Sequence, residues 1–169
     1  GKAVTRTTCA LSSRELIIVP PDVFLMSGLR VLDLSRNKLK VLPPEIKFLS
    51  SLLELNVSRN SLKSIPAELG YLAELETINA LSNKLNQRTI PFGILAKMPQ
   101  LRLLDLRYNE KCKSRPEIEN FFKESNSSDS FIKILITKRV KPIRDPGIVG
   151  DHACDRDATK LRSQLEPWG

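Results

Sequence analysis

The chain has 169 residues, of which 41% are hydrophobic, 27% charged and 5% aromatic, and its formal net charge is +8. This length suits a single hydrophobic core or one stack of repeats and excludes two full-sized domains. No apolar run approaches the roughly 18 residues of a membrane-spanning helix, and the few aromatic residues predict a mainly aliphatic core.

A repeated pattern becomes regular at Leu29. From there the spacing reads LxxLxLxxNxL, with the asparagine at Asn37, and the same pattern returns 23 residues later. A third copy begins at Leu75 and is lengthened by three residues, and a fourth begins at Leu101 and then departs from the pattern. Residues 29–113 therefore form the regular array, and the period indicates a repeat architecture.

Residues 1–28 are a degenerate copy of the same pattern. Cys9 and Leu11 stand in register with later apolar positions, whereas Arg6 and Arg14 replace the first leucine and the asparagine. A terminal repeat is exposed on one side, so departures of this kind are expected there. We interpret this segment as an N-terminal capping repeat.

The spacing has a physical explanation. In each LxL element the two apolar side chains point to the same side of a short strand, and successive copies stack as neighbouring parallel strands. The asparagine follows where the chain turns, and its amide satisfies backbone groups that stacking would otherwise leave unpaired. The Leu-Pro element and the apolar positions after it form the outer wall.

These residues resemble the leucine-rich-repeat family, and the 23-residue form with Leu-Pro-x-x-Ile/Leu resembles its intracellular members that scaffold signalling proteins. The match covers residues 9 to about 111. The resemblance implies an α/β fold, a leucine-rich-repeat solenoid with a right-handed curved arc of parallel strands. A helical or irregular convex side and a C-terminal cap complete that fold.

The segment after the array predicts the cap and a tail. A capping serine, an early proline and an apolar face predict a helix over about residues 115–125, and the apolar run 131–136 predicts a strand. We therefore expect residues 114–136 to form the C-terminal cap. Residues 137–169 read as a basic connection followed by a short helix over 155–166, either a strap on the solenoid or a partner-binding segment.

Catalytic chemistry has little support in the sequence. His152 is the only histidine, so histidine triads and multi-histidine metal sites are excluded, and a metal at His152-Ala-Cys154 would need ligands from elsewhere. No glycine-rich phosphate loop is present. We expect no enzyme activity, no cofactor and no metal.

Cysteine usage indicates the compartment. Cys9, Cys112 and Cys154 are an odd number without a CxxC pair, which is typical of a reduced environment. We therefore expect an intracellular protein, cytoplasmic, with the nucleus as the alternative. Because the chain starts at Gly1 and not at methionine, we also expect a processed or excised product.

Surface recognition remains as the function. Residues flanking the inward leucines of each strand, and the position after them, are expected to line the concave face. The candidates are Asp33, Ser35, Arg36, Glu54, Asn56, Ser58, Arg59, Thr77, Asn79, Leu81, Asp105, Arg107 and Tyr108. Arginine and tyrosine are favoured anchors at interfaces, so this mixed surface predicts binding of a partner protein.

Two alternatives stay open. A nucleic-acid (RNA) partner would use basic patches at Arg30, Lys38, Lys40 and Lys47 with residues 138–144, although Asp33 and its equivalents oppose phosphate on the concave strip. A regulatory or targeting fragment of a larger enzyme would have the same local chemistry. The main hypothesis is a monomeric, non-catalytic scaffold module for another protein, with no membrane and no small-molecule substrate.

Overall fold

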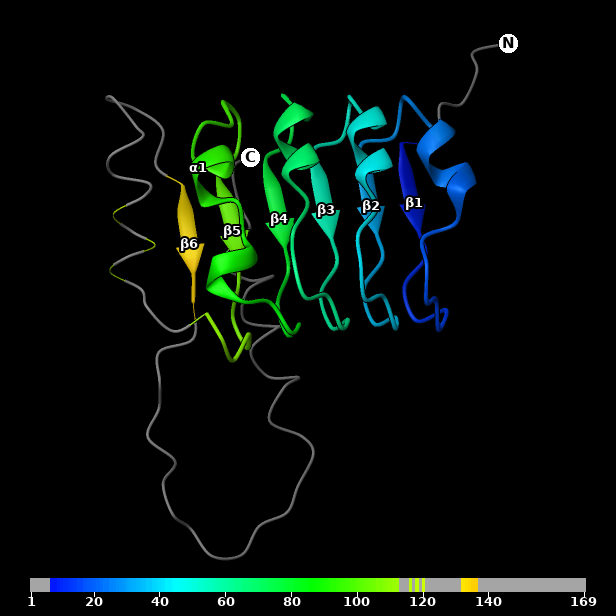
Figure 1. Cartoon of the computed structure of the whole chain (residues 1–169). Coiled ribbons are helices and arrows are strands. Elements are labelled where there is room, and N and C mark those ends of the chain that lie inside the picture. The colour runs from blue at the N-terminus through cyan, green and yellow to red at the C-terminus, as the bar shows by residue number, and fades with distance from the viewer. Residues whose placement is uncertain (1–6, 113–115, 117, 119, 121–131, 137–169) are drawn as a thin grey trace, which may run out of the picture. The chain divides into compact units, whose positions relative to one another are not determined.

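The computed structural model describes residues 7–112, 116, 118, 120 and 132–136 (Figure 1). The chain divides into two units, Gly1–Arg139 and Val140–Gly169, and the second unit lies wholly outside the described residues. The fold reported below is therefore that of the first unit. In this described part, no helix is long and apolar enough to cross a membrane.

A parallel sheet is the framework of the first unit. The strands are β1 (Thr8–Ala10), β2 (Val31–Asp33), β3 (Glu54–Asn56), β4 (Thr77–Asn79), β5 (Leu103–Asp105) and β6 (Lys133–Leu135). These six strands pair in chain order, each parallel to the next. Figure 1 shows them side by side, with the helical turns on one face of the sheet. This arrangement confirms the solenoid.

The pairing register reproduces the sequence period. Thr8 pairs with Val31, Val31 with Glu54 and Glu54 with Thr77, a step of 23 residues each time. Thr77 then pairs with Leu103, a step of 26 residues, because the third repeat is longer. The insertion is therefore absorbed outside the strands, and the sheet register is kept.

The face opposite the open sheet surface is built from short helical turns. They are the 3-10 helices η1 (Pro21–Leu25), η2 (Pro44–Phe48), η3 (Ala67–Tyr71) and η4 (Gln87–Thr89) and the α-helix α1 (Phe92–Leu95). Pro20, Pro43 and Pro66 occupy the N-cap positions of the first three turns. A proline lacks the N–H of a helix interior and fixes φ near its helical value, so each turn starts at a defined residue.

The core is aliphatic, as the composition predicts. Leu32, Leu55, Ile78 and Leu104 occupy equivalent central positions of β2 to β5 and are 0–1% exposed. Among the buried residues described, aromatic side chains occur only at Phe24 and Phe92. Each repeat thus buries its apolar side chains mainly against neighbouring repeats, which is the property that requires caps at both ends.

The asparagines form the predicted hydrogen-bonded ladder. Asn83 Nδ2 donates to the carbonyl oxygens of Ala80 in its own repeat (3.2 Å) and Val57 in the preceding repeat (3.0 Å). Its Oδ1 accepts from the backbone N–H of Leu62 (3.0 Å). The same arrangement recurs at Asn37, Asn60 and Asn109. Each amide therefore joins two repeats through groups that stacking buries.

Two parts of the expected C-terminal cap lie within the described residues. Pro116, Ile118 and Asn120 have helical backbone, inside the expected 115–125 helix, and Ile118 is completely buried. β6 lies inside the expected 131–136 strand and extends the sheet beyond β5. The remainder of the cap helix, residues 137–169 and the His152–Cys154 pair lie outside the described residues. The proposed segment boundaries at residues 28, 113 and 136 stay predictions.

Cys112 lies at the end of the regular array and is 3% exposed. Its Sγ donates to the carbonyl oxygen of Leu85 at 3.6 Å. Burial raises the pKa of the Cys112 thiol from 9.0 to about 11. Because the thiolate is the reactive form, we expect Cys112 of the native protein to react with iodoacetamide at about pH 8 far more slowly than after unfolding, as measured by mass spectrometry of its peptide.

The same pKa shift predicts a pH dependence of stability. Between about pH 9 and about pH 11 the thiol stays protonated in the folded chain and ionises in the unfolded chain. The unfolded state then binds fewer protons, so the free energy of unfolding falls as the pH rises through this window. In the Cys112→Ala variant this part of the decline should disappear. Rapid labelling of native Cys112 would contradict its burial.

Candidate functional site

The open surface of the sheet is the predicted concave face, and it consists of rows that run across the repeats. The first row, on the first residue of each strand, is Val31, Glu54, Thr77 and Leu103. Glu54 is exposed and the others are half-buried. An acid, a hydroxyl and two apolar side chains thus stand on neighbouring strands, about 4.8 Å apart.

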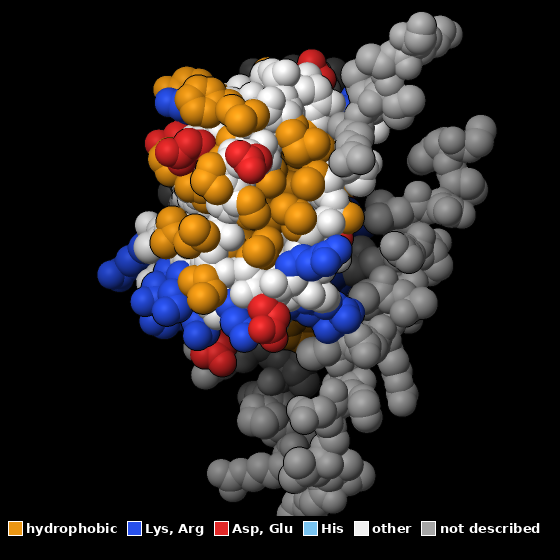
Figure 2. All heavy atoms as spheres, turned by 90° about the vertical axis from the view of Figure 1, so that its right-hand side faces the viewer, with side chains coloured by type: hydrophobic (Ala, Val, Ile, Leu, Met, Phe, Trp, Pro, Cys, Tyr) orange, Lys and Arg blue, Asp and Glu red, His pale blue; other side chains and the backbone are white. Residues whose placement is uncertain are grey.

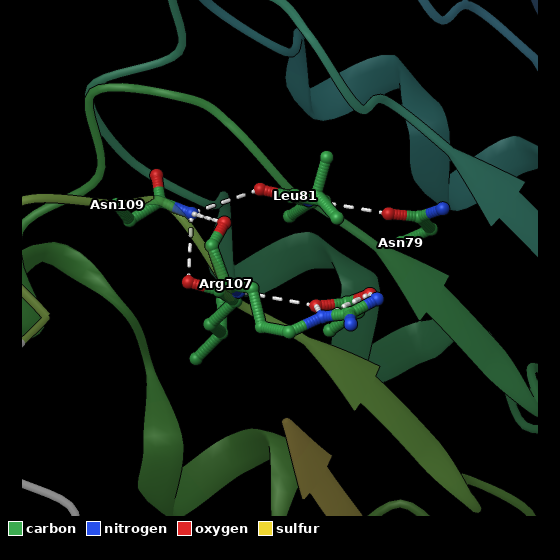
Figure 3. Close-up of polar contacts among 7 residues, drawn as sticks. Asn79, Leu81, Arg107 and Asn109 are labelled. Carbon is green, nitrogen blue, oxygen red and sulfur yellow. Dashed lines mark hydrogen bonds and ion pairs between the residues drawn. The ribbon is translucent and has the colours of Figure 1, made fainter. Parts of the chain in front are cut away.

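The second row has a structural role that the sequence analysis did not foresee. It consists of Asp33, Asn56, Asn79 and Asp105, the last residues of their strands. In each case Oδ1 accepts a hydrogen bond from the backbone N–H two residues later, at 2.9–3.2 Å. Figure 3 shows this bond between Asn79 and Leu81. These are Asx turns, in which a short polar side chain substitutes for a backbone turn, so the row shapes the strand ends.

Three of the concave-face candidates are buried. Ser35 and Ser58 are each 8% exposed, and Asp105 is 4% exposed. The Asp105 carboxylate accepts hydrogen bonds from the backbone N–H and from the guanidinium of Arg107 (Figure 3). Nη2 of Arg107 lies 2.8 Å from Oδ2 of Asp105. These three side chains therefore offer little surface to a partner, and the Asp105 charge is paired within the chain.

A third row carries the arginine and tyrosine candidates. Arg36, Arg59, Ser82 and Tyr108 each stand immediately before a ladder asparagine and have φ between 54° and 58°. This left-handed conformation is uncommon for residues other than glycine, asparagine and aspartate. Three of these residues donate their backbone N–H to a carbonyl oxygen of the next repeat: Arg36 to Ser58, Arg59 to Leu81 and Ser82 to Arg107. The bonds between repeats hold the strained backbone, so these side chains start from fixed positions.

The solvent exposure of this row favours its use as a contact surface. Arg36 and Tyr108 are exposed, Tyr108 to 42%, and Arg59 and Ser82 are half-buried. Of the remaining candidates, Leu81 and Arg107 are half-buried. The structure therefore brings Arg36, Arg59 and Tyr108 to one line at the strand ends.

Charge is distributed unevenly over the repeats. We define the turn edge as the segments that follow β1 to β5, residues 12–18, 35–41, 58–64, 81–89 and 107–112. These segments contain ten Lys and Arg residues against two Glu residues. Figure 2 shows Lys and Arg side chains gathered in the lower part of the molecule, with some acidic side chains among them and mostly hydrophobic and acidic side chains above. The excess positive charge is therefore concentrated at this edge.

The basic residues of the nucleic-acid alternative are not all brought together. Arg30 immediately precedes β2 and Lys47 lies in η2, whereas Lys38 and Lys40 follow β2 on the turn edge. Residues 138–144 lie outside the described residues. An anion-binding surface would therefore have to use the turn edge rather than the patch expected from the sequence.

The arrangement of metal-ligating and buried polar side chains in the described residues also bears on the choice of site. Among residues 7–112 and 132–136, no group of three or more His, Cys, Asp or Glu side chains is arranged to hold a metal ion. Every buried side-chain nitrogen or oxygen described there has a hydrogen-bond partner. The surface rows, and not an enclosed polar cluster, are thus the candidate site.

Comparisons with known proteins agree with this architecture. The leucine-rich-repeat family model matches residues 28–85. A comparison with curated protein sequences finds no match. Among solved structures, internalin C2 from Listeria monocytogenes is 21% identical, with a TM-score of 0.61, and the alignment covers 78% of this chain and 51% of the internalin chain.

Two plant receptors are also similar. One is the plant peptide hormone receptor RGFR1 in complex with RGF2, 32% identical over 63% of this chain and 17% of the receptor chain, with a TM-score of 0.56. The other is the ectodomain of the Arabidopsis thaliana membrane receptor kinase GASSHO1/SCHENGEN3 in complex with CASPARIAN STRIP INTEGRITY FACTOR 2. It is 28% identical, with a TM-score of 0.57, and the alignment covers 71% of this chain and 14% of the receptor chain. The chain thus spans about half of the internalin and under a fifth of either receptor.

Proposed function

The chain is a leucine-rich-repeat protein, and from that premise we propose that it is a non-catalytic interaction module that binds a partner protein on its concave face. The observation that carries the proposal is the line of Arg36, Arg59 and Tyr108 at the strand ends, where backbone bonds between repeats hold the two arginines. A preformed surface loses little conformational entropy on binding, and arginine and tyrosine are frequent anchors of interfaces.

The composition of the face supports a polypeptide partner. Glu54, Thr77 and Asn56 offer charged, hydroxyl and amide groups beside the half-buried apolar Val31 and Leu103. A mixture of this kind satisfies the polar backbone and the side chains of a protein segment. The two similar plant receptors are in complexes with RGF2 and CASPARIAN STRIP INTEGRITY FACTOR 2, which also favours a polypeptide ligand.

The setting that we propose is cytoplasmic, with the chain acting as a monomeric scaffold in signalling. The described cysteines, Cys9 and Cys112, are thiols, which is compatible with a reduced compartment. A regulatory fragment of a larger enzyme would use the same face in the same way. Expression of the tagged chain followed by cell fractionation tests the location.

Charge reversal at the concave face tests the binding proposal. We expect Arg36→Asp/Arg59→Asp to reduce capture of partner proteins in a pull-down roughly tenfold or more, because two anchor charges are inverted at the contact. Aspartate is the suitable replacement because it tolerates the left-handed backbone of both positions. Thermal unfolding, followed by circular dichroism, checks that the variant is folded.

A charge-matched control separates the face from the net charge. Lys63→Asp/Lys84→Asp makes the same charge change at two exposed residues of the turn edge that, unlike Arg36 and Arg59, are not candidates of the concave face. Capture that survives in this control but fails in the arginine double variant supports the concave face. Equal capture by the wild-type chain and the arginine double variant would refute it.

The turn edge favours a nucleic-acid partner as the second candidate function. Ten basic residues against two acidic ones provide phosphate contacts along this edge. Titration with RNA at rising salt concentration, using the lysine double variant as the test protein, decides the matter. Binding that is weak, indifferent to sequence and lost near physiological salt would remove this candidate.

A further inference from the structure

The convex side carries a second row of side chains that the solenoid does not need for its core. Leu25, Phe48, Tyr71 and Ile94 are large apolar residues, exposed to 80%, 56%, 73% and 39%. Leu25, Phe48 and Tyr71 are the last residues of η1, η2 and η3, and Ile94 is the third residue of α1, the next helical turn. Large apolar side chains exposed in a contiguous patch commonly mark an interaction site.

The row is continuous across the repeats. η1 contacts η2, η2 contacts η3 and η3 contacts α1. The Ile94 side chain covers Gly70, where an added Cβ would overlap Ile94 Cγ2, and Gly70 directly precedes Tyr71. Adjacent members of the row therefore lie on touching turns. With a minimum step of about 4.8 Å per repeat, the row is at least about 15 Å long.

A row of carboxylates runs beside the apolar row. Asp22, Glu45 and Glu68 lie in the first turns of η1, η2 and η3, each three residues before an apolar member. In a 3-10 helix, residues three apart are eclipsed, so each acid stands on the same side of its turn as its apolar neighbour. We call these seven residues the convex strip.

The local charge is opposite in sign to that of the whole chain. The convex segments 21–28, 44–51, 67–74 and 91–98 contain four acidic and two basic residues, although the chain as a whole has a net charge of +8. One of the two bases, Lys47, places Nζ 5.3 Å from the centre of the Phe48 ring. Figure 2 shows hydrophobic and acidic side chains together in the upper part of the molecule.

We propose that the convex strip binds an amphipathic helix of another protein whose apolar stripe is flanked by lysine or arginine residues. The apolar row matches the apolar stripe, and the parallel acidic row matches basic residues on its flank. At 1.5 Å per residue, a helix of about 10 residues spans the minimum length of the row. The ring–ammonium pair of Lys47 and Phe48 shows that this strip accepts a cation against an aromatic face.

The charge and the size of the strip argue against two other occupants. Asp22, Glu45 and Glu68 repel the anionic headgroups of a membrane surface. Four side chains in a single row offer far less than the roughly 800 Å² per partner of a stable protein dimer, so a second copy of the chain is a poor fit.

Binding of designed helical peptides to the full chain tests the proposal. The probe is a peptide of about 18 residues with leucines at helical spacing flanked by lysines, and its partner probe has glutamate in place of every lysine. Fluorescence anisotropy should show binding of the lysine peptide and much weaker binding of the glutamate peptide. The Phe48→Ser/Tyr71→Ser variant should bind the lysine peptide roughly tenfold or more weakly than the wild-type chain.

Matched variants locate the binding. Ile17→Ser/Val41→Ser also removes two exposed apolar side chains, each 64% exposed, from outside the strip and should leave binding within about twofold. Glu45→Gln/Glu68→Gln should weaken the binding of the lysine peptide and not that of the glutamate peptide. Arg36→Asp/Arg59→Asp on the concave face should leave the binding of the lysine peptide unchanged. This last result also keeps the test independent of the concave-face proposal.

Four results would overturn the proposal. They are no binding of either peptide, equal binding of both, unchanged binding by Phe48→Ser/Tyr71→Ser, or equal loss in the Ile17 and Val41 control. Binding to phosphatidylcholine–phosphatidylserine vesicles that the Phe48 and Tyr71 changes abolish would assign the strip to membranes instead. A dimer in sedimentation that the same changes dissolve would assign it to self-association.

Discussion

Replacing Leu55 by alanine should lower the free energy of unfolding by about 2–5 kcal/mol. Leu55 is 1% exposed and lies at the centre of β3, between Leu32 of β2 and Ile78 of β4. The smaller side chain leaves a cavity among three stacked repeats that cannot collapse without shifting the strand register. Chemical denaturation followed by circular dichroism measures the change.

A surface substitution serves as the control for this cavity. Val41→Ala removes apolar atoms from a side chain that is 64% exposed and should change the free energy of unfolding by less than about 0.5 kcal/mol. A loss at Leu55 no larger than the loss at Val41 would mean that the β3 position is not part of the core.

Replacing Asn83 by alanine should cost roughly 3 kcal/mol of the free energy of unfolding, because it leaves at least two buried backbone groups unpaired at about 1–3 kcal/mol each. The groups are the N–H of Leu62 and the carbonyl of Val57, both bonded to the Asn83 amide. Asn83→Asp should be at least as destabilising, because a carboxylate cannot donate to the Val57 and Ala80 carbonyls and brings a charge into the ladder.

Asn86 provides the matched asparagine. It is the N-cap of η4, and its Oδ1 accepts from the Arg88 N–H at 3.1 Å within a single turn. Asn86→Ala should cost only about 1 kcal/mol, the usual contribution of an N-cap. If Asn83→Ala and Asn86→Ala are equally stable, the ladder does not hold neighbouring repeats together.

The framework was predictable from sequence because it depends on repetition. Inward leucines recur at a constant step, so the parallel register between β2, β3 and β4 follows from the spacing alone. The asparagine ladder was predictable for a related reason, since an amide with both a donor and an acceptor recurs at each turn. The aliphatic core follows from the low aromatic content, and the lengthened third repeat was visible as an interrupted period.

The candidate site was predictable only in part. Alternation along a strand predicts which side of the sheet a side chain faces, but it does not predict how much of that side chain is exposed to solvent. Asp33 and Asn56 lie at the ends of their strands, and their bonds to the backbone two residues later depend on how each strand ends. The Asp-x-Ser and Asn-x-Ser spacing was the available signal, as aspartate and asparagine are the residues that form Asx turns. The burial of Ser35, Ser58 and Asp105 depends on neighbouring repeats.

The left-handed row was hidden for a different reason. Arginine and tyrosine have no preference for positive φ, so the residue types at Arg36, Arg59 and Tyr108 do not predict this conformation. Only the asparagine that follows each of them marks the place. The convex strip was likewise missed, because its members belong to separate repeats and become a row only when the solenoid stacks them.

Photo-crosslinking from a single concave position tests the proposed function most directly. We place a benzophenone amino acid at Thr77, in the first row of the concave face, and in a second protein at Gln100, which is exposed in the loop before β5. The account predicts a discrete crosslinked partner from Thr77, lost in the Arg36→Asp/Arg59→Asp background, and none from Gln100. A partner crosslinked from Gln100 but not from Thr77 would contradict it.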